Sequence, residues 1–221
     1  MLKLYSYPES GNSYKVRLLL SFLALPHEIV DVDLMTDEQH GPAYLAINPR
    51  GEVPALRDGE LLLRDSAAIL VYLAARYAPD PWYPCEPRAM AAITEWLAFA
   101  ASWIQYGVFT ARALVAFGIP ANGLPPGFPA SLEEARVRGT RSLEILDAEL
   151  RMRPWLTGER PSIADIANFP YVALAPMGGI ALEPYPAVLD WIARFRALPG
   201  FIPIAGLDDP QYRKAGTPSS P

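Results

Sequence analysis

The sequence predicts an α/β domain with a mixed four-stranded sheet, followed by an all-helical domain. Three observations support this prediction. A strand, a helix and a second strand follow one another with short links over residues 2–34. Residues 55–66 (ALRDGELLLRDS) then place an Asp-Gly step between two apolar runs, which is a strong signal for a β-hairpin. Beyond the proline-rich residues 78–87, the patterns are those of helices.

The first three elements predict a parallel crossover. Residues 2–7 alternate and are rich in Leu and Tyr, as in a strand, and Pro8 ends this strand. Residues 10–13 (SGNS) are typical of a turn and a helix cap. Apolar residues then recur at helical spacing, at Val16, Leu19, Leu20 and Leu23. Residues 29–34 predict the second strand, and short links of this kind imply a right-handed crossover.

The rest of the first domain contains two helices and the hairpin. We expect a short helix over residues 42–48. Asp58 and Gly59 form the tip of the hairpin, because both residue types can take a positive φ. Residues 66–77 (SAAILVYLAARY) predict the next helix. The resulting order is βαβ-α-ββα, and we assign this domain to residues 1–78.

The second domain begins after a linker. Four prolines within residues 78–87 are typical of an interdomain segment, and we place the linker at residues 79–87. A long amphipathic helix is expected over residues 88–115, followed by a loop rich in Pro and Gly over residues 118–129. We assign the domain to residues 88–205.

Capping signals define the later helices. The segment from Ser131 to Glu134 is a capping box for a helix that runs to about residue 151. Ser162 and Asp165 form a second box of the same kind. A further helix is expected over residues 186–198. Residues 206–221 are expected to form a loose tail.

Composition excludes several classes of function. The 221 residues are 51% hydrophobic and 19% charged, so the chain can build a core. A net charge of −5 argues against a nucleic-acid or anionic-membrane partner, since both require a basic surface. No apolar run approaches the length of a membrane span. The lone cysteine, Cys85, cannot form an internal disulfide, which favours a reducing compartment. With two histidines, we expect no metal site.

Four sequence blocks, in order, resemble the glutathione S-transferase family. They are LYSYPES, NPRGEVPAL, RDSAAILVYL and WLTGERPSIADIANFP, and the resemblance extends over roughly residues 2–205. It is strongest to the classes that use serine at the active site, of the theta, phi or bacterial kind. The resemblance implies a thioredoxin-like first domain, an all-helical second domain, and glutathione as co-substrate.

Val53 and Pro54 form the first part of the expected site. An X-Pro bond is usually trans, and a proline here could simply begin an edge strand. The resemblance implies instead a cis bond. It further implies that the main-chain N–H and C=O of Val53 bind the cysteinyl residue of glutathione like an added strand.

Asp65 and Ser66 precede the helix over residues 66–77. Either residue can act as its N-cap. Free amides and the helix dipole also make a helix N-terminus a site for an anion. By resemblance, Ser66 holds the γ-glutamyl carboxylate and Asp65 faces the α-ammonium group.

Ser10 is the residue that the resemblance aligns with the catalytic serine. The thiolate is the reactive form of a thiol, and a serine can stabilise it by donating a hydrogen bond. Asn12 is the main rival, and Ser13 is a further alternative; any of these residues can also be a helix cap. Tyr7 lies too early in the sequence to match the tyrosine of other classes.

The glycyl end of glutathione has weaker candidates. By resemblance, His40 lies near the glycyl carboxylate, although a solvated loop histidine is equally consistent with the sequence. Gly41 offers no neighbouring cation, and Arg50 is a possible substitute.

Aromatic residues on the long helix are candidates for the pocket of the second substrate. They are Trp103, Tyr106 and Phe109, together with Arg112. Such a stripe at helical spacing also fits a core or a dimer contact.

These observations together predict a cytoplasmic, homodimeric glutathione transferase that joins the glutathione thiolate to a small electrophile. A glutathione-dependent disulfide reductase or peroxidase is an alternative. An isomerase of the maleylacetoacetate kind is another, but Gly11 and Asn12 interrupt its Ser-Ser-Cys-Ser signature. The third alternative is a glutathione-binding module without turnover.

Overall fold

A computed structural model describes residues 1–119 and 128–213 of the chain. The expected loop over residues 118–129 therefore lies largely outside the described residues. The sheet has the order β2-β1-β3-β4, in which β1 (Leu2–Ser6) is parallel to β2 (His27–Asp31) and antiparallel to β3 (Ala55–Asp58). Strand β4 (Leu61–Arg64) completes the hairpin with β3. The predicted mixed four-stranded sheet is thus confirmed.

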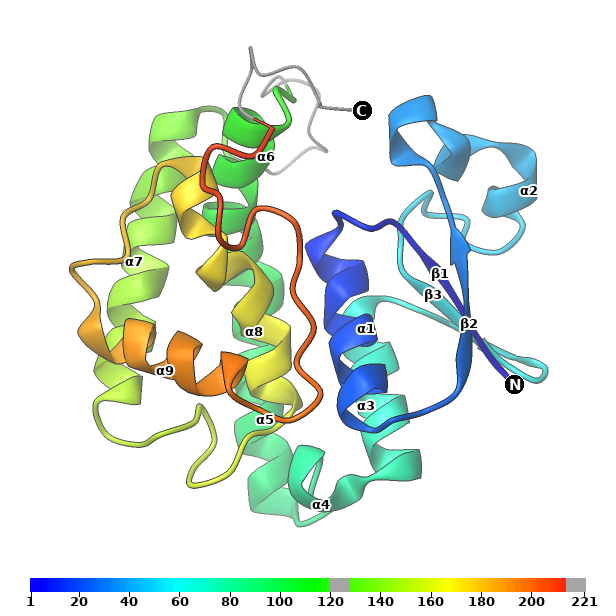
Figure 1. Ribbon diagram of the computed structural model, residues 1–221, viewed down its shortest axis with the longest axis horizontal. Helices are drawn as coiled ribbons and strands as arrows, with labels where there is room; N and C mark the ends of the chain where they lie inside the picture. Colours follow the sequence, from blue (N-terminus) through cyan, green and yellow to red (C-terminus); the bar gives the residue numbers. More distant parts are fainter. Residues whose placement is uncertain (120–127, 214–221) are drawn as a thin grey trace.

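Helices cover both faces of this sheet (Figure 1). Helices α1 (Gly11–Phe22) and α3 (Ser66–Tyr77) pack together on the face toward the helical half. The short elements η1 (Leu34–Thr36), η2 (Glu38–His40) and α2 (Pro42–Leu45) lie beyond the other face. The predicted helix over residues 42–48 is therefore shorter than expected.

The two faces of the sheet have different cores, and β1 contributes to both. Leu2 and Leu4 belong to the large core shared with the helices, whereas Tyr5 packs against a smaller cluster that includes Val32 and Tyr44. This alternation follows from the period of two along a strand.

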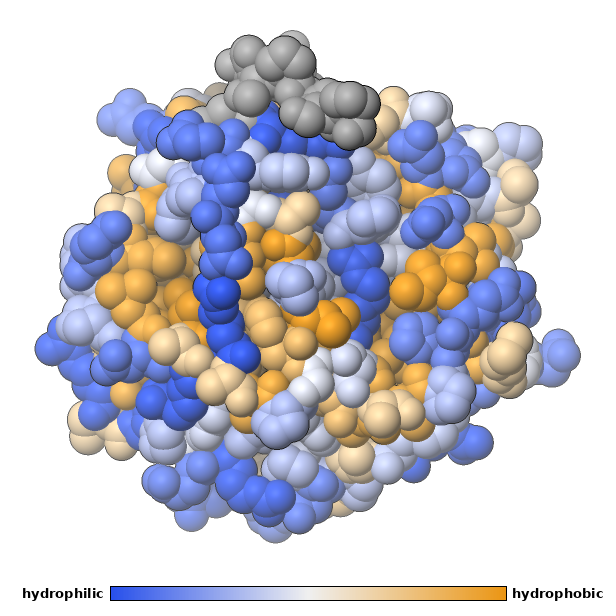
Figure 2. All heavy atoms as spheres, in the orientation of Figure 1, coloured by the Kyte–Doolittle hydropathy of each residue, from blue (hydrophilic) through white to orange (hydrophobic). Residues whose placement is uncertain are grey.

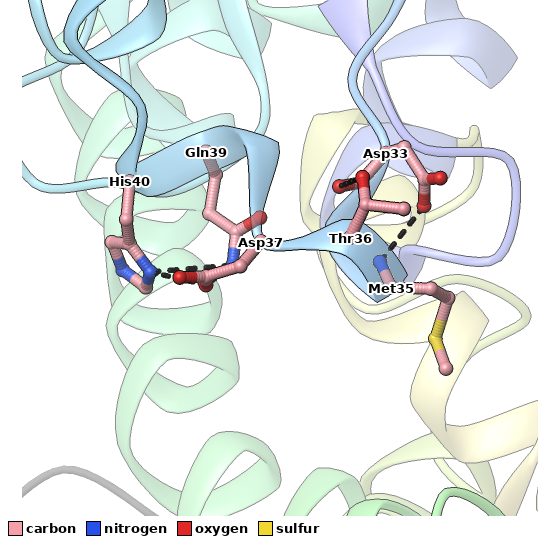
Figure 3. A network of polar contacts seen from close by, with 6 residues as sticks. All are labelled: Asp33, Met35, Thr36, Asp37, Gln39 and His40. Atoms are coloured by element: carbon pink, nitrogen blue, oxygen red, sulfur yellow. Dashed lines mark hydrogen bonds and ion pairs between the residues drawn. The ribbon is translucent and has the colours of Figure 1, made fainter.

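The second predicted strand ends earlier than expected, at Asp31. Asp33 explains the difference, because its carboxylate accepts a hydrogen bond from the main-chain N–H of Met35 at 2.8 Å (Figure 3). This bond begins the 3-10 turn η1 and removes residue 34 from the strand.

The helical half begins in the proline-rich segment. Helix α4 (Pro79–Trp82) forms within it, and Trp82 is buried and stacks on Phe22 with ring centroids 5.1 Å apart. The remaining described elements are α5 (Pro87–Phe99), η3 (Ala100–Phe109), α6 (Thr110–Ala116), α7 (Leu132–Leu150), α8 (Ile163–Ala173), η5 (Ala175–Gly178) and α9 (Pro186–Arg196).

Residues 87–116 form one continuous helical run, as expected for residues 88–115, but its middle part is unusual. Segment η3 has π-helical hydrogen bonding over ten residues. Helix α7 packs along it, and Gly107 lies against Gly139 so closely that a Cβ added to Gly107 would lie 2.6 Å from the Gly139 nitrogen. π-Helical turns are rare and frequently occur near functional sites.

One buried core joins the two halves. The same apolar cluster includes Leu18 of α1 and Phe169 of α8, and α1 lies between the sheet and α8 (Figure 1). On the face shown in Figure 2, hydrophilic residues dominate the outline, while apolar residues appear on both halves. None of the described helices is long and apolar enough to cross a membrane.

The expectation of a loose tail is wrong for residues 206–213. Asp208 forms an ion pair with Arg196 at 2.8 Å, and Arg213 forms one with Glu9 at 2.7 Å. These contacts fix the tail to the body of the protein. Residues 214–221 lie outside the described part of the chain.

Candidate functional site

The candidate site lies at one edge of the sheet, where three segments meet. Ala55 pairs with Tyr5 on one side and with Arg64 on the other. The register therefore brings the end of β1, the residues before β3 and the residues after β4 side by side. These segments carry Ser10, the Val53-Pro54 pair and the Asp65-Ser66 pair, respectively.

Ser10 is the N-cap of α1. Its Oγ accepts a hydrogen bond from the main-chain N–H of Ser13 at 3.2 Å, and the side chain is half-buried. Ser13 is fully buried, and its Oγ accepts from the main-chain N–H of Tyr7 at 3.4 Å. As an acceptor, the Ser10 hydroxyl keeps its own hydrogen available for donation. Of these two serines, only Ser10 is partly exposed.

Asn12 lies in the first turn of α1 and is half-buried. Its Oδ1 accepts a hydrogen bond from Nζ of Lys15 at 2.9 Å. Lys15 is buried, with 4% of its surface exposed, and burial lowers the pKa of its ammonium group to about 8. The resemblance did not point to Lys15. The signal in the sequence was its place on the buried face of α1, four residues after Gly11.

Tyr7 packs in the small core on the far face of the sheet. Its hydroxyl donates to Oε1 of Glu9 at 3.5 Å. Burial and the Glu9 carboxylate raise the pKa of Tyr7 above its usual value. Its hydroxyl is therefore a weak hydrogen-bond donor toward an anion.

The Val53-Pro54 bond is cis, as predicted. The Val53 side chain is buried in the small core. Within residues 1–119 and 128–213, no other residue hydrogen-bonds to the main-chain N–H or C=O of Val53. The preceding carbonyl, that of Glu52, is held by Tyr44 Oη at 2.7 Å and by Asn48 Nδ2 at 2.6 Å. The loop is thus fixed while the edge at Val53 stays free.

Asp65, rather than Ser66, is the N-cap of α3. Its Oδ1 accepts from the main-chain N–H groups of Ala67 at 2.8 Å and Ala68 at 3.3 Å. Asp65 has a φ of 81°, in a region that non-glycine residues rarely adopt. Such conformations persist where the surroundings impose them, often at binding sites. Ser66 is the buried first residue of the helix.

His40 lies in a small polar network at the rim of the sheet half (Figure 3). Its Nδ1 lies 2.6 Å from Oδ1 of Asp37, and Nε2 of Gln39 donates to the same oxygen at 3.0 Å. The side chain of His40 is exposed. Arg50 is also exposed, and none of the described residues forms an ion pair with its guanidinium.

Two of the four residues predicted for a second pocket contact one region. The rings of Tyr106 and Phe109 both pack on Phe128, with centroids 4.8 and 6.2 Å away. Phe109 also packs on Tyr171 of α8 at 5.1 Å. Trp103 is separate, because it stacks on Phe99 and is 43% exposed. The aromatic stripe is therefore divided between two surfaces.

Arg112 is buried and connects the helical half to the candidate site. Its Nη2 donates to the main-chain oxygen of Glu9 at 3.3 Å, and its Nε contacts Sδ of Met177 at 3.4 Å. Burial lowers the pKa of this guanidinium from its usual value.

The described residues contain no group of three or more His, Cys, Asp or Glu side chains with the geometry of a metal site. Cys85 is exposed and unpaired with another cysteine.

Two family models match this chain. The N-terminal domain of glutathione S-transferase matches residues 4–81, and the C-terminal domain matches residues 110–199. The chain belongs to the glutathione S-transferase family. The fold agrees with this assignment, with a thioredoxin-like N-terminal domain and a helical C-terminal domain.

Relatives of this chain are named for different activities. The disulfide-bond oxidoreductase YfcG of Escherichia coli (strain K12) is 33% identical over 211 residues, covering 90% of this chain and 92% of that protein. A maleylacetoacetate isomerase of Pseudomonas aeruginosa is 32% identical, covering 85% and 87% of the two chains. The crystal structure of a glutathione S-transferase from Xanthobacter autotrophicus has a TM-score of 0.83 and 32% identity, covering 94% of this chain and 98% of the other. Family membership therefore supports a glutathione-dependent enzyme activity.

Proposed function

We propose that this protein is a glutathione transferase that joins the sulfur of glutathione to a small, apolar electrophile. The observation that carries the proposal is the free main-chain edge at Val53, beside the N-termini of two helices. An extended peptide can add to such an edge through main-chain hydrogen bonds, and a helix N-terminus favours the anionic ends of the same peptide.

Each part of glutathione then has a partner in this proposal. The cysteinyl main chain pairs with Val53, next to Pro54. The γ-glutamyl carboxylate lies at the first turn of α3, on Ser66, with Asp65 toward the α-ammonium group. The glycyl carboxylate lies toward His40 and Arg50.

The sulfur lies at the first turn of α1 in this arrangement. A thiol titrates near ~8.5, so lowering that value by about two units needs about 2.7 kcal/mol of preferential stabilisation of the thiolate. The Ser10 hydroxyl supplies one hydrogen bond, and the free amides of the helix add to it. The thiol proton leaves to solvent, because serine is no base at neutral pH.

Tyr106 and Phe109 form the side toward the second substrate, and the buried Arg112 links this side to Glu9. With an activated aryl chloride, the thiolate attacks the carbon that bears chlorine, a carbon–sulfur bond forms, and chloride leaves with the bonding electrons. We further propose a homodimer and a cytoplasmic location, as the family resemblance implies. The exposed stack of Trp103 on Phe99 supports a contact between copies at η3.

A second candidate is a glutathione-dependent disulfide reductase. Asn12 beside Ser10 offers a second polar contact for sulfur, and a relative with 33% identity is named as a disulfide-bond oxidoreductase. In that reaction one glutathione thiolate attacks a disulfide sulfur and expels a thiolate. A second glutathione then completes the exchange.

Two measurements test the proposal. Calorimetry should detect binding of reduced glutathione, and the absence of heat at millimolar concentration would contradict both candidates. Turnover of an activated chloronitrobenzene then supports conjugation, whereas activity with hydroxyethyl disulfide alone supports the reductase. Tight binding without either turnover would favour a binding module.

A further inference from the structure

Lys15 is a buried cation that the proposed reaction does not yet use. Only 4% of its surface is exposed, and its Nζ lies 5.1 Å from the centre of the Tyr171 ring. Among the described residues, it forms no ion pair with a carboxylate. A buried ammonium group without such a partner is costly, and an apolar residue of similar size usually serves stability better. Stability alone therefore does not account for a lysine here.

The contact between Lys15 and Asn12 fixes the orientation of an amide. An ammonium group has donors and no acceptor, so the atom of Asn12 that faces it is the carbonyl oxygen, Oδ1, at 2.9 Å. The NH2 group of the same amide is consequently directed away from Lys15. Within residues 1–119 and 128–213, this NH2 group has no hydrogen-bond partner. Asn12 is only half-buried, and it lies two residues after Ser10 at the start of α1.

We propose that Lys15 is a positioning residue, which holds the Asn12 amide with its NH2 group toward the sulfur of bound glutathione. Asn12 then donates the second hydrogen bond to the thiolate, beside that of Ser10. This inference rests on the proposed function, because it assigns a role to a neighbour of the same sulfur.

The groups around Lys15 are consistent with this role. Burial disfavours the charged lysine and lowers its pKa to about 8, while the carboxylate of Asp65, at the start of α3, partly offsets this effect. The ammonium form therefore predominates at neutral pH. On α8, burial raises the pKa of Tyr171 to about 12, so this ring is neutral. The amide oxygen of Asn12 is thus held by a lysine that is charged at neutral pH.

A set of four variants tests the inference. K15M removes the charge and the donor while keeping an unbranched side chain, and K15R keeps both. N12A removes the proposed donor, and the double variant K15M/N12A measures the coupling between the two residues. The readouts are the pKa of bound glutathione, from the ultraviolet absorbance of its thiolate, and the dissociation constant from calorimetry.

We expect K15M to raise the pKa of bound glutathione by about one unit, the scale of one charge-assisted hydrogen bond. K15R should restore most of the wild-type value. In the N12A background, K15M should produce no further shift, because the residue through which Lys15 acts is gone. Thermal unfolding of each variant verifies that it folds. If K15M does not fold, the variants N12A and N12S are compared in its place.

Three outcomes would overturn the inference. If wild-type protein binds no glutathione, the proposed function fails and the inference fails with it. If glutathione binds normally and K15M leaves the pKa unchanged, only the inference fails. If K15M raises the pKa equally in the N12A background, Lys15 acts directly through its charge and the positioning role is wrong.

Discussion

Arg213 forms a bidentate ion pair with Glu9, the residue before the candidate catalytic Ser10. Its Nε donates to Oε2 and its Nη2 to Oε1, both at 2.7 Å. The two residues are 204 positions apart in the sequence. Arg112 donates to the main-chain oxygen of the same glutamate. The turn that leads into α1 is therefore held by the helical half and by the C-terminal segment together.

The variant R213M should destabilise the protein. Glu9 is 8% exposed, so it would keep a buried charge without its partner, at a cost of about 1–3 kcal/mol in the free energy of unfolding. Urea denaturation measures this loss. R160M is the matched control, because it breaks the exposed pair with Asp80 and should cost less than about 1 kcal/mol. Equal effects of the two variants would show that the Glu9 pair contributes little.

Local signals in the sequence predicted much of this fold. The Asp-Gly step correctly gave the hairpin between β3 and β4, but the turn lies one residue later than expected: Asp58 pairs with Leu61 in the ladder, and Gly59 alone of the two takes a positive φ, of 59°. The predicted capping box of Ser162 and Asp165 is complete. The other is only half formed: Ser131 accepts from the N–H of Glu134, but the Glu134 carboxylate accepts from the N–H of Ala130 and not from that of Ser131. Such signals are readable because every partner lies within a few residues.

Contacts between distant segments had no such signal. Nothing near Glu9 in the sequence indicates Arg213, and the composition of the tail suggested a loose end. Nor does helical periodicity distinguish the π-helical η3 from an ordinary helix. Their place before helices marks Ser10 and Asp65 as possible caps, and the family resemblance supplied their roles in the site. The orientation of Asn12 depends instead on which side chain fills the space beside it.

The variant S10A should raise the pKa of bound glutathione. It removes one hydrogen bond to the thiolate, so we expect a shift of about one unit and a loss of about tenfold in the conjugation rate at neutral pH. The ultraviolet titration of bound thiolate measures the shift. S13A is the control, since Ser13 is fully buried and should affect stability rather than titration. A larger shift in S13A would transfer the role to Ser13.

Close packing between η3 and α7 predicts that G107A destabilises the protein. The added Cβ would lie 2.6 Å from the Gly139 nitrogen and 2.8 Å from its Cα, and main-chain atoms cannot move aside as a flexible side chain can. Overpacking of this kind costs about 1–3 kcal/mol. Thermal and urea unfolding measure the change. A101S, at an exposed position of the same segment, should be nearly neutral. Wild-type stability in G107A would mean that the two helices separate easily.

The burial of Lys15 makes stability depend on pH in a definite direction. Its pKa is about 8 in the folded protein against a usual value of 10.5, so between these values the unfolded chain binds more protons. The free energy of unfolding from this group therefore rises as pH increases through that window, while below about pH 8 the full penalty of burying the charge is present. Urea denaturation of wild type and K15M from pH 7 to pH 10 should show their difference shifting in favour of wild type. K15R should show no such shift, because arginine stays protonated throughout. A difference between wild type and K15M that is constant with pH would mean that Lys15 keeps an ordinary pKa, and that its ammonium group is better hydrated than its burial against Tyr171 indicates.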